Sequence, residues 1–252
     1  MTNNKETVFI TGAGRGLGFA TASLLAHYGY NLILNFRKDQ GKSRAGLNTF
    51  IANHPDTKVT LAKADISEPR DISMMVKKLQ EEEGIEKIDH IILNAAAAPF
   101  KPLLEMTKND WKLLLNTNLV GNISCLQNLV PMMNKGGTIT LLSSLGSKTV
   151  LRDYPLGIVK SALENVVKYL EVELTDADIR VNGVCAGYVN TDMAPYLKEL
   201  WPDIFAKVDK SNRRIMIEPI EIAEIIAFLI SSKSSAIRGT TILADLGVTL
   251  EP

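Results

Sequence analysis

Three polar side chains in the middle of the chain, Ser144, Tyr154 and Lys160, could act together on an oxygen atom that gains negative charge. A phenol can donate a hydrogen bond or a proton to such an oxygen, and a lysine cation close by lowers the pKa of the phenol from about 10. A serine hydroxyl can polarise the same oxygen with a second hydrogen bond. We therefore expect the three residues to share one site.

The spacing between Tyr154 and Lys160 decides how they can meet. Residues six positions apart on one α-helix lie about 120° from sharing a face, so a continuous helix would keep the two side chains apart. Pro155 disfavours helical geometry in the residue before it and suits the first position of a helix. We expect Tyr154 to lie on the non-helical entry to a helix, where a loop sets its reach.

A second candidate site is the glycine run from Thr11 to Gly18, Thr-Gly-Ala-Gly-Arg-Gly-Leu-Gly. The apolar residues before it predict a strand and the residues after it predict a helix. In that context backbone N–H groups and the positive end of the helix can approach a pyrophosphate with no side chain in the way. The run therefore predicts a dinucleotide-binding loop, with a plain tight turn as the alternative for this motif taken alone.

The elements that must position these residues alternate between short β-type segments and longer helical patterns. Helical patterns include residues 16–28, 71–83 and 160–174. The central strand segments are apolar without alternation, which is typical of strands covered on both faces. We predict an α/β fold, a Rossmann-type doubly wound parallel sheet, in a single domain over residues 1–252. The predicted strands are residues 7–11, 31–35, 58–64, 90–94, 138–143, 180–185 and 240–244.

Residues 192–216 interrupt this alternation of strands and helices, because the segment is too long for an ordinary connection between a strand and a helix. We interpret the segment as a substrate lid. Its apolar side chains suggest an acyl-like pocket, although they could equally pack the lid onto the core. They are Met193, Tyr196, Leu197, Trp201 and Phe205.

Composition argues against several classes of partner. The 28 basic and 28 acidic side chains balance, without a long run of either sign, so we expect neither nucleic acid nor a membrane surface as a partner. The N-terminus lacks an apolar signal core, and no apolar run approaches membrane-spanning length. Cys125 and Cys185 pair with no histidine at metal-ligand spacing, so we expect no metal. We expect a soluble, cytoplasmic protein with reduced thiols.

The spacing Thr-Gly-x-x-x-Gly-x-Gly resembles the short-chain dehydrogenase/reductase family, and further matches follow in order over nearly the whole chain. Ala96 and Leu246 stand where that family has glycine, and Ala186 where it has proline. The matches are Asp65-Ile66, Asn94-Ala95-Ala96, Asn118, Ser143-Ser144, the turn from Ala186 to Thr191, and the segment from Arg238-Gly239 to Asp245-Leu246-Gly247.

The resemblance implies a nicotinamide dinucleotide cofactor. An acid at the end of the second strand would accept hydrogen bonds from a free ribose, but no acid is present there, and Arg15, Arg37 and Lys38 could converge on a 2′-phosphate. We predict NADPH over NADH, the alternative being solvated surface charges. The residues expected to contact the cofactor are Gly12, Arg15, Gly16, Leu17, Gly18, Arg37, Lys38, Asp65, Ile66, Asn94, Ala95, Ala96, Lys160, Gly187, Val189 and Thr191.

In the family's carbonyl reductases the tyrosine and lysine are four residues apart, but the residue four before Lys160 is Leu156. The segment from Ser143 to Glu164 resembles instead the NADPH-dependent enoyl-acyl-carrier-protein reductases of the FabL type. Those enzymes carry Tyr-x6-Lys, one residue longer than the step here.

This second resemblance assigns roles to the reacting groups. Tyr154 would be the proton donor or oxyanion stabiliser, and Ser144 would polarise the substrate oxygen. Lys160 would bind the nicotinamide ribose and lower the tyrosine pKa. Asn118 would hold a proton-relay water in a carbonyl reductase. The alternatives are a packing role for Tyr154, a surface role for Lys160, and a helix-packing role for Asn118.

Three functions remain open. The first is hydride transfer to the C=C of an enoyl thioester, a small-molecule substrate carried on acyl carrier protein or coenzyme A. The second is reduction of a 3-oxoacyl or other carbonyl group in fatty-acid, polyketide or specialised metabolism. The third, motivated by the displaced tyrosine, is an NADP-binding protein without redox turnover. Apolar helix faces at residues 117–133 and 160–174, together with the pairing of family members there, predict a homotetramer or homodimer.

Overall fold

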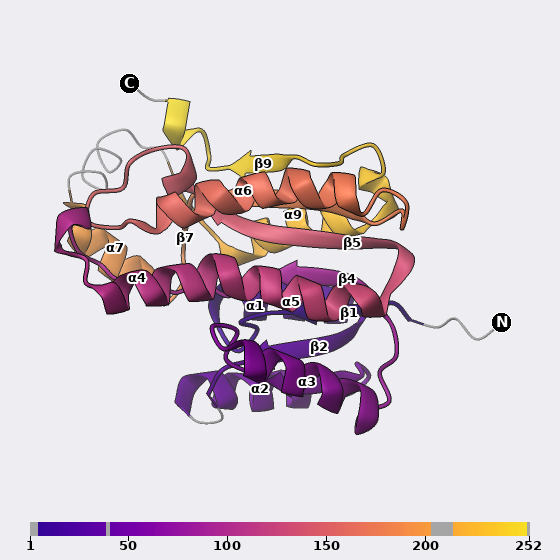
Figure 1. The fold of residues 1–252 in the computed structure, drawn as a ribbon. Helices are drawn as coiled ribbons and strands as arrows, with labels where there is room; N and C mark the ends of the chain where they lie inside the picture. The colour runs from indigo at the N-terminus through magenta and orange to yellow at the C-terminus, as the bar shows by residue number, and fades with distance from the viewer. Residues whose placement is uncertain (1–4, 39–40, 203–213, 251–252) are drawn as a thin grey trace.

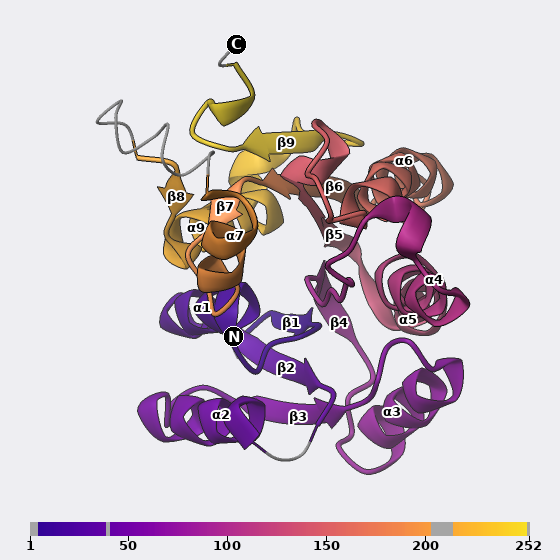
Figure 2. The ribbon, with the colours of Figure 1, turned by 90° about the vertical axis from the view of Figure 1, so that its left-hand side faces the viewer.

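Seven parallel strands form one sheet in the order β3-β2-β1-β4-β5-β6-β9 (Figures 1 and 2). The computed structural model describes residues 5–38, 41–202 and 214–250. Each segment predicted to be a strand lies in this sheet, so the doubly wound fold is confirmed. The strands are β1 (Thr7–Ile10), β2 (Asn31–Phe36), β3 (Val59–Lys63), β4 (Ile88–Leu93), β5 (Met133–Ser144), β6 (Arg180–Ala186) and β9 (Thr241–Ala244).

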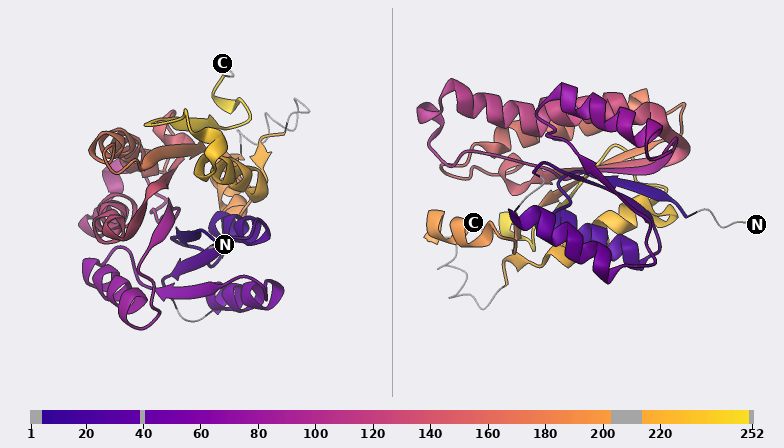
Figure 3. Two further views of the ribbon diagram at one scale, coloured as in Figure 1. Left: turned by 90° about the vertical axis from the view of Figure 1, so that its right-hand side faces the viewer. Right: turned by 90° about the horizontal axis from the view of Figure 1, so that it is seen from below.

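Helices cover both faces of the sheet (Figures 2 and 3). Successive strand residues are divided between the faces: Phe9 packs into one core, and Val8 and Ile10 pack into the other. Both faces are therefore buried, which explains the apolar strands without alternation. One face carries α1 (Gly16–His27), α2 (Gly41–Asn53) and α9 (Pro219–Ile230), and the other carries α3 (Pro69–Glu81), α5 (Gly121–Leu129) and α6 (Leu156–Glu173).

The helix predicted at residues 117–133 is broken into several pieces. Helix α4 (Lys108–Leu115) begins with a capping box in which Thr107 and Asp110 exchange hydrogen bonds. A π-helical turn at Asn116–Val120 then leads into α5, and a 3₁₀ turn follows it. Single π-turns inside helices often occur at functional sites, and this one lies beside the cleft described below.

The predicted lid rises from a second, two-stranded sheet that the sequence analysis missed. Strand β7 (Tyr188–Val189) pairs in parallel with β8 (Met216–Ile217). Helix α7 (Ala194–Leu200) follows β7 in the chain and lies beyond the carboxyl ends of the main strands (Figure 1). Parallel strands need a crossover connection, which accounts for the length of the segment. Residues 203–213, including Phe205, lie outside the described residues.

Leu246 adopts a φ of +57°, in the left-handed region. A side chain in that region costs about 1–2 kcal/mol, which gives a physical reason for the glycine found there in the resembling family. Leu246 packs against the core between the sheet and α1 and α9, so apolar contact offsets part of this strain.

Two further observations concern the described part of the chain. It contains no helix long and apolar enough to cross a membrane, and no cluster of three histidine, cysteine or acidic side chains that could hold a metal. Cys125 and Cys185 are both buried and unpaired as thiols.

Candidate active site

A cleft of about 680 Å³ lies at the carboxyl ends of the strands, where the strand order reverses between β1 and β4. Ligands of open α/β sheets bind at this reversal. The predicted cofactor residues that line the cleft come from several separate segments. They are Gly12, Arg15, Gly16, Leu17, Arg37, Lys38, Asp65, Ile66, Asn94, Ala95, Ala96 and Thr191.

The glycines of the run have different physical roles. Gly12 and Gly16 have φ angles of +66° and +57°, which favour glycine. A methyl group at Gly18 would lie 2.4 Å from the carbonyl oxygen of Gly12, so Gly18 permits close packing beneath the loop rather than lining the cleft. Helix α1 has no side-chain cap at its N-terminus, which leaves backbone N–H groups of its first turn for an anion.

Thr117 is a candidate cofactor-binding residue that the sequence did not predict. Its side chain is 6% exposed, it lines the cleft, and its Oγ1 has no hydrogen-bond partner among the described residues. Buried hydroxyls rarely lack a partner. A dinucleotide, which offers many hydrogen-bonding atoms, fits this cleft. The only signal in the sequence was the position of Thr117 next to Asn118.

The basic residues expected at the 2′-phosphate line the cleft, and the two arginines among them already lie near acidic side chains. Arg37 Nε lies 4.0 Å from Asp65 Oδ2, and Arg15 Nη1 lies 3.8 Å from Asp192 Oδ2. Both arginine side chains are more than half exposed, so these pairs are weak. The arginines remain available to an anion, and Lys38 lines the same cleft.

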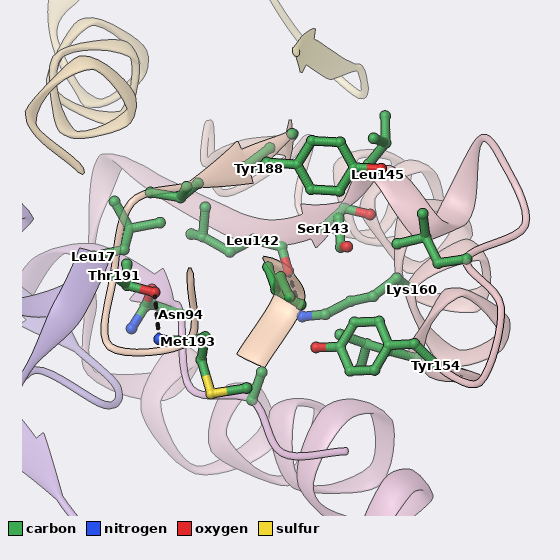
Figure 4. A pocket seen from close by; sticks show the side chains of 18 of the residues that line it. Leu17, Asn94, Leu142, Ser143, Leu145, Tyr154, Lys160, Tyr188, Thr191 and Met193 are labelled. Carbon is green, nitrogen blue, oxygen red and sulfur yellow. Dashed lines mark hydrogen bonds between the residues drawn. The ribbon is translucent and has the colours of Figure 1, made fainter. Parts of the chain in front are cut away.

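A smaller cavity of about 180 Å³ adjoins the cleft, and Ser144, Tyr154 and Lys160 line it together. Figure 4 shows the Tyr154 hydroxyl and the Lys160 ammonium group directed toward the same region. Among the described residues that line it, only Lys160 carries a charge. The predicted Gly187 and Val189 line this cavity rather than the larger cleft. Its apolar lining includes Leu17, Leu142, Leu145, Leu151, Leu156, Val189, Met193, Leu197 and Trp201.

Lys160 is buried, with 3% of its surface exposed, and its Nζ donates a 2.6 Å hydrogen bond to the carbonyl oxygen of Leu142 at the end of β5. Burial lowers the pKa of Lys160 to about 8, and the nearby Cys185 thiol opposes this shift. The ammonium form therefore still predominates at neutral pH. Lys160 is therefore not a surface lysine.

Tyr154 lies just outside α6, as the sequence predicts, although Pro155 is the N-cap of the helix rather than its first residue. Burial raises the pKa of Tyr154 to about 12, opposite to the lowering expected from a nearby lysine. The rings of Phe100 and Trp201 contact the phenol and exclude water from it, whereas the charge of Lys160 is directed to Leu142. Among the described residues the Tyr154 hydroxyl has no hydrogen-bond partner, so it can donate to a substrate oxygen.

The adjacent serines have different surroundings. Ser144 Oγ accepts a 3.4 Å hydrogen bond from the Gly146 N–H, which leaves its own O–H to donate into the cavity. Ser143 Oγ donates to Glu164 on α6 at 2.7 Å. Burial raises the pKa of Glu164, but hydrogen bonds from Lys148, Ser147 and Ser143 outweigh burial and lower it overall. The ionised Glu164 therefore fastens the turn that presents Ser144.

Asn118 is fully engaged in hydrogen bonds and lines neither cavity. Its Nδ2 donates to the carbonyl oxygens of Ala97 at 2.6 Å and Leu114 at 2.8 Å, and its Oδ1 accepts from the Ala97 N–H at 3.3 Å. Its own carbonyl oxygen accepts from Asn122 Nδ2 at 2.7 Å. This arrangement favours the helix-packing alternative over a relay-water site.

The lid contributes three of its predicted apolar residues to the small cavity: Met193, Leu197 and Trp201. Tyr196 lies on the same helix but is 62% exposed and does not line the cavity.

Comparison with known proteins identifies the family. A family model described as enoyl-(acyl carrier protein) reductase matches residues 12–249. The structure of a short-chain dehydrogenase/reductase of the glucose/ribitol dehydrogenase type from Brucella melitensis superposes with a TM-score of 0.83, covering 96% of each chain at 29% identity. The chain belongs to the short-chain dehydrogenase/reductase family.

Relatives of this short-chain dehydrogenase/reductase are named as oxidoreductases, and the chain is accordingly an oxidoreductase. Oxidoreductase UcpA of Escherichia coli is 30% identical over 97% of this chain and 95% of its own. The 1-cyclohexenylcarbonyl-CoA reductase of Streptomyces collinus is 28% identical over 98% and 88%. The 3-oxoacyl-[acyl-carrier-protein] reductase FabG of Staphylococcus epidermidis is 26% identical over 96% and 98%.

Proposed function

We propose that the protein reduces the C=C bond of an enoyl thioester with NADPH. The observation that carries this proposal is the placement of Tyr154, six residues before Lys160, in the same cavity as Lys160 and Ser144. Similarity to a reductase of 1-cyclohexenylcarbonyl-CoA, which is itself an enoyl thioester, supports the choice of bond.

In this proposal the cleft holds the cofactor, which supplies the hydride when it is bound. The uncapped N-terminus of α1 and the loop from Gly12 to Gly16 would contact its pyrophosphate. Arg15, Arg37 and Lys38 would contact a 2′-phosphate, which favours NADPH over NADH.

The chain's own groups act on the thioester oxygen. Hydride addition at the β-carbon leaves negative charge on this oxygen, and a Tyr154 phenol with a pKa of about 12 is protonated and able to donate to it. Ser144 donates a second hydrogen bond, and the Lys160 cation favours the same charge. The α-carbon of the enolate then takes a proton from solvent water, which completes the addition of two hydrogens, so the oxygen needs stabilisation but no relay through Asn118.

The dimensions and lining of the small cavity define the part of the substrate beside the reacting bond. Six leucines line it, and Tyr188 and Trp201 are among its aromatic side chains. These surfaces suit an apolar acyl group. In this proposal the described part of the lid, with Met193 and Leu197, covers that group.

Incubation with NADPH and a four-carbon enoyl-CoA tests the proposal. We expect consumption of NADPH and a product heavier by two hydrogens. Tight NADPH binding without consumption, for this and for longer or cyclic enoyl thioesters, would contradict it.

A carbonyl reductase of 3-oxoacyl thioesters is the second candidate, favoured by similarity to FabG. In that reaction the oxygen itself must keep a proton, and the fully engaged Asn118 offers no evident site for a relay water. Consumption of NADPH with a 3-oxoacyl thioester but not with the enoyl thioester would select this candidate.

We also propose that the protein self-associates through α6 and the helical region around residues 113–120. Tyr169 and Val172 on α6 are 70% and 75% exposed, and Leu113, Leu115 and Val120 are also exposed apolar residues. Sedimentation velocity over a concentration series is expected to show a dimer or tetramer, and a monomer at every concentration would contradict this.

A further inference from the structure

Two aromatic rings from distant parts of the chain hold the ring of Tyr154. Phe100, in the loop after β4, stacks on it with ring centroids 4.7 Å apart and planes 9° apart. Trp201, the C-cap of α7 in the lid, meets it at 62° with a centroid distance of 5.8 Å. Both rings therefore come from elements other than α6, the helix that follows Tyr154 in the chain.

Trp201 also holds the turn that carries Tyr154. Its Nε1 donates a 2.8 Å hydrogen bond to the carbonyl oxygen of Arg152, and the side chain is 6% exposed. Within this turn the Tyr154 N–H donates to the Leu151 carbonyl at 3.2 Å, and Asp153 has a left-handed φ of +58°. A buried indole N–H needs an acceptor, so the bond to Arg152 fixes the turn relative to α7.

A tyrosine on a turn has less intrinsic rigidity than one on a helix. In this chain α6 begins at Leu156, so helical hydrogen bonds do not fix the backbone of Tyr154. Catalytic groups lose much of their effect when they are displaced by about 1 Å. The direction of the hydroxyl must therefore be set by contacts outside the helix, and Phe100 and Trp201 supply them.

We propose that Phe100 and Trp201 are positioning residues that aim the Tyr154 hydroxyl at the substrate oxygen, and that the Trp201–Arg152 hydrogen bond links the lid to the tyrosine. This inference rests on the proposed function, because it gives the Tyr154 hydroxyl a role in turnover. Phe100 and Trp201 need not touch the reacting atoms.

Two substitutions test the two contacts separately. Trp201→Phe keeps an aromatic ring but removes the N–H, and Phe100→Leu removes the stacked ring. We expect each to lower kcat by about 10- to 100-fold. Trp201 does not line the cofactor cleft, so Trp201→Phe is expected to change the Kd of NADPH by less than about twofold, whereas Phe100 does line it and Phe100→Leu is judged by kcat at saturating NADPH. Phe100→Tyr keeps the stacked ring and is expected to retain kcat. Tyr28→Phe removes an aromatic hydrogen-bond donor, to Glu224, at a residue that lines neither cavity, and as the control it is expected to leave kcat unchanged.

Combination with Tyr154→Phe separates positioning from a general structural role. If the two residues act through the Tyr154 hydroxyl, Phe100→Leu and Trp201→Phe will lower the residual kcat of Tyr154→Phe by less than about twofold. Full additional losses in that background, or unchanged kcat in both single variants, would overturn the inference while leaving the proposed function intact. Unchanged kcat in Tyr154→Phe itself would instead overturn the proposed role of the tyrosine. Thermal unfolding of each variant verifies that it is folded at the assay temperature.

Discussion

The ammonium group of Lys160 donates a 2.6 Å hydrogen bond to the carbonyl oxygen of Leu142, which fixes a buried cation at the end of β5. The strand thus holds the lysine, whereas a turn and two aromatic rings hold Tyr154. The two groups reach one cavity by independent routes, so a helical spacing of four residues is not needed to bring them together.

Burial of Lys160 predicts a pH dependence of stability. Its pKa is about 8 in the folded protein against an ordinary value of 10.5, so between these values the unfolded chain binds a proton that the folded protein does not. The free energy of unfolding of the wild type should therefore rise with pH over this window relative to Lys160→Met, by up to about 3 kcal/mol. Urea unfolding of both proteins from pH 7 to pH 10 measures this, and a constant difference would contradict it.

The cofactor preference depends on charge at the end of β2. Replacing Arg37 with glutamate should weaken NADPH binding by about 10- to 100-fold, because a charged hydrogen bond contributes about 1.5–3 kcal/mol. NADH binding should be unchanged or tighter, since the acid can accept from the ribose. Titration calorimetry with both cofactors measures the two affinities.

Lys168→Glu on the exposed surface of α6 makes the same change of charge away from the cleft and serves as the control for Arg37→Glu. Equal losses of NADPH affinity in both variants would show a general charge effect and would contradict a phosphate contact at Arg37.

Gly18 is expected to tolerate no side chain. In Gly18→Ala the new methyl group would lie 2.4 Å from the Gly12 carbonyl oxygen and 2.6 Å from Asn94 Nδ2, so the loop must shift. We expect at least a tenfold loss of NADPH affinity, measured by fluorescence titration. Gly84→Asn is the control, because Gly84 has open space around it and asparagine tolerates its φ of +63°. Unchanged affinity in Gly18→Ala would show that the loop geometry is not needed.

We expect Asn118 to stabilise the fold rather than to hold a water molecule of a proton relay. Asn118→Ala removes two part-buried hydrogen bonds with Ala97 and a buried one to the carbonyl oxygen of Leu114, which should cost about 2–3 kcal/mol in the free energy of unfolding. Asn128→Ala removes one hydrogen bond, to Ser124, and should cost about 1 kcal/mol. If Asn118→Ala keeps its stability but loses turnover, the relay interpretation is correct.

The sequence was sufficient to predict the sheet and to predict that most of the proposed cofactor residues meet at one cleft, because periodicity and glycine spacing are local signals. It did not reveal Phe100 and Trp201 as neighbours of Tyr154, since their contact depends on the packing of a loop and a lid far apart in the chain. The sequence predicted a lowered pKa for Tyr154, and this prediction was wrong for the same reason. These neighbours remove water from the phenol and raise its pKa. Nor did it reveal the pairing of β7 with β8, because two-residue strands leave no periodic pattern.

The most direct test of the central claim compares an enoyl thioester with a 3-oxoacyl thioester of equal chain length, in the wild type and in Tyr154→Phe. NADPH consumption and product mass are measured in each case. We predict reduction of the enoyl thioester by the wild type and a loss of about 10²- to 10³-fold in Tyr154→Phe, the range expected for removal of one hydrogen-bond donor to a developing oxyanion. Reduction of only the 3-oxoacyl thioester, or an unaltered rate in Tyr154→Phe, would contradict the claim.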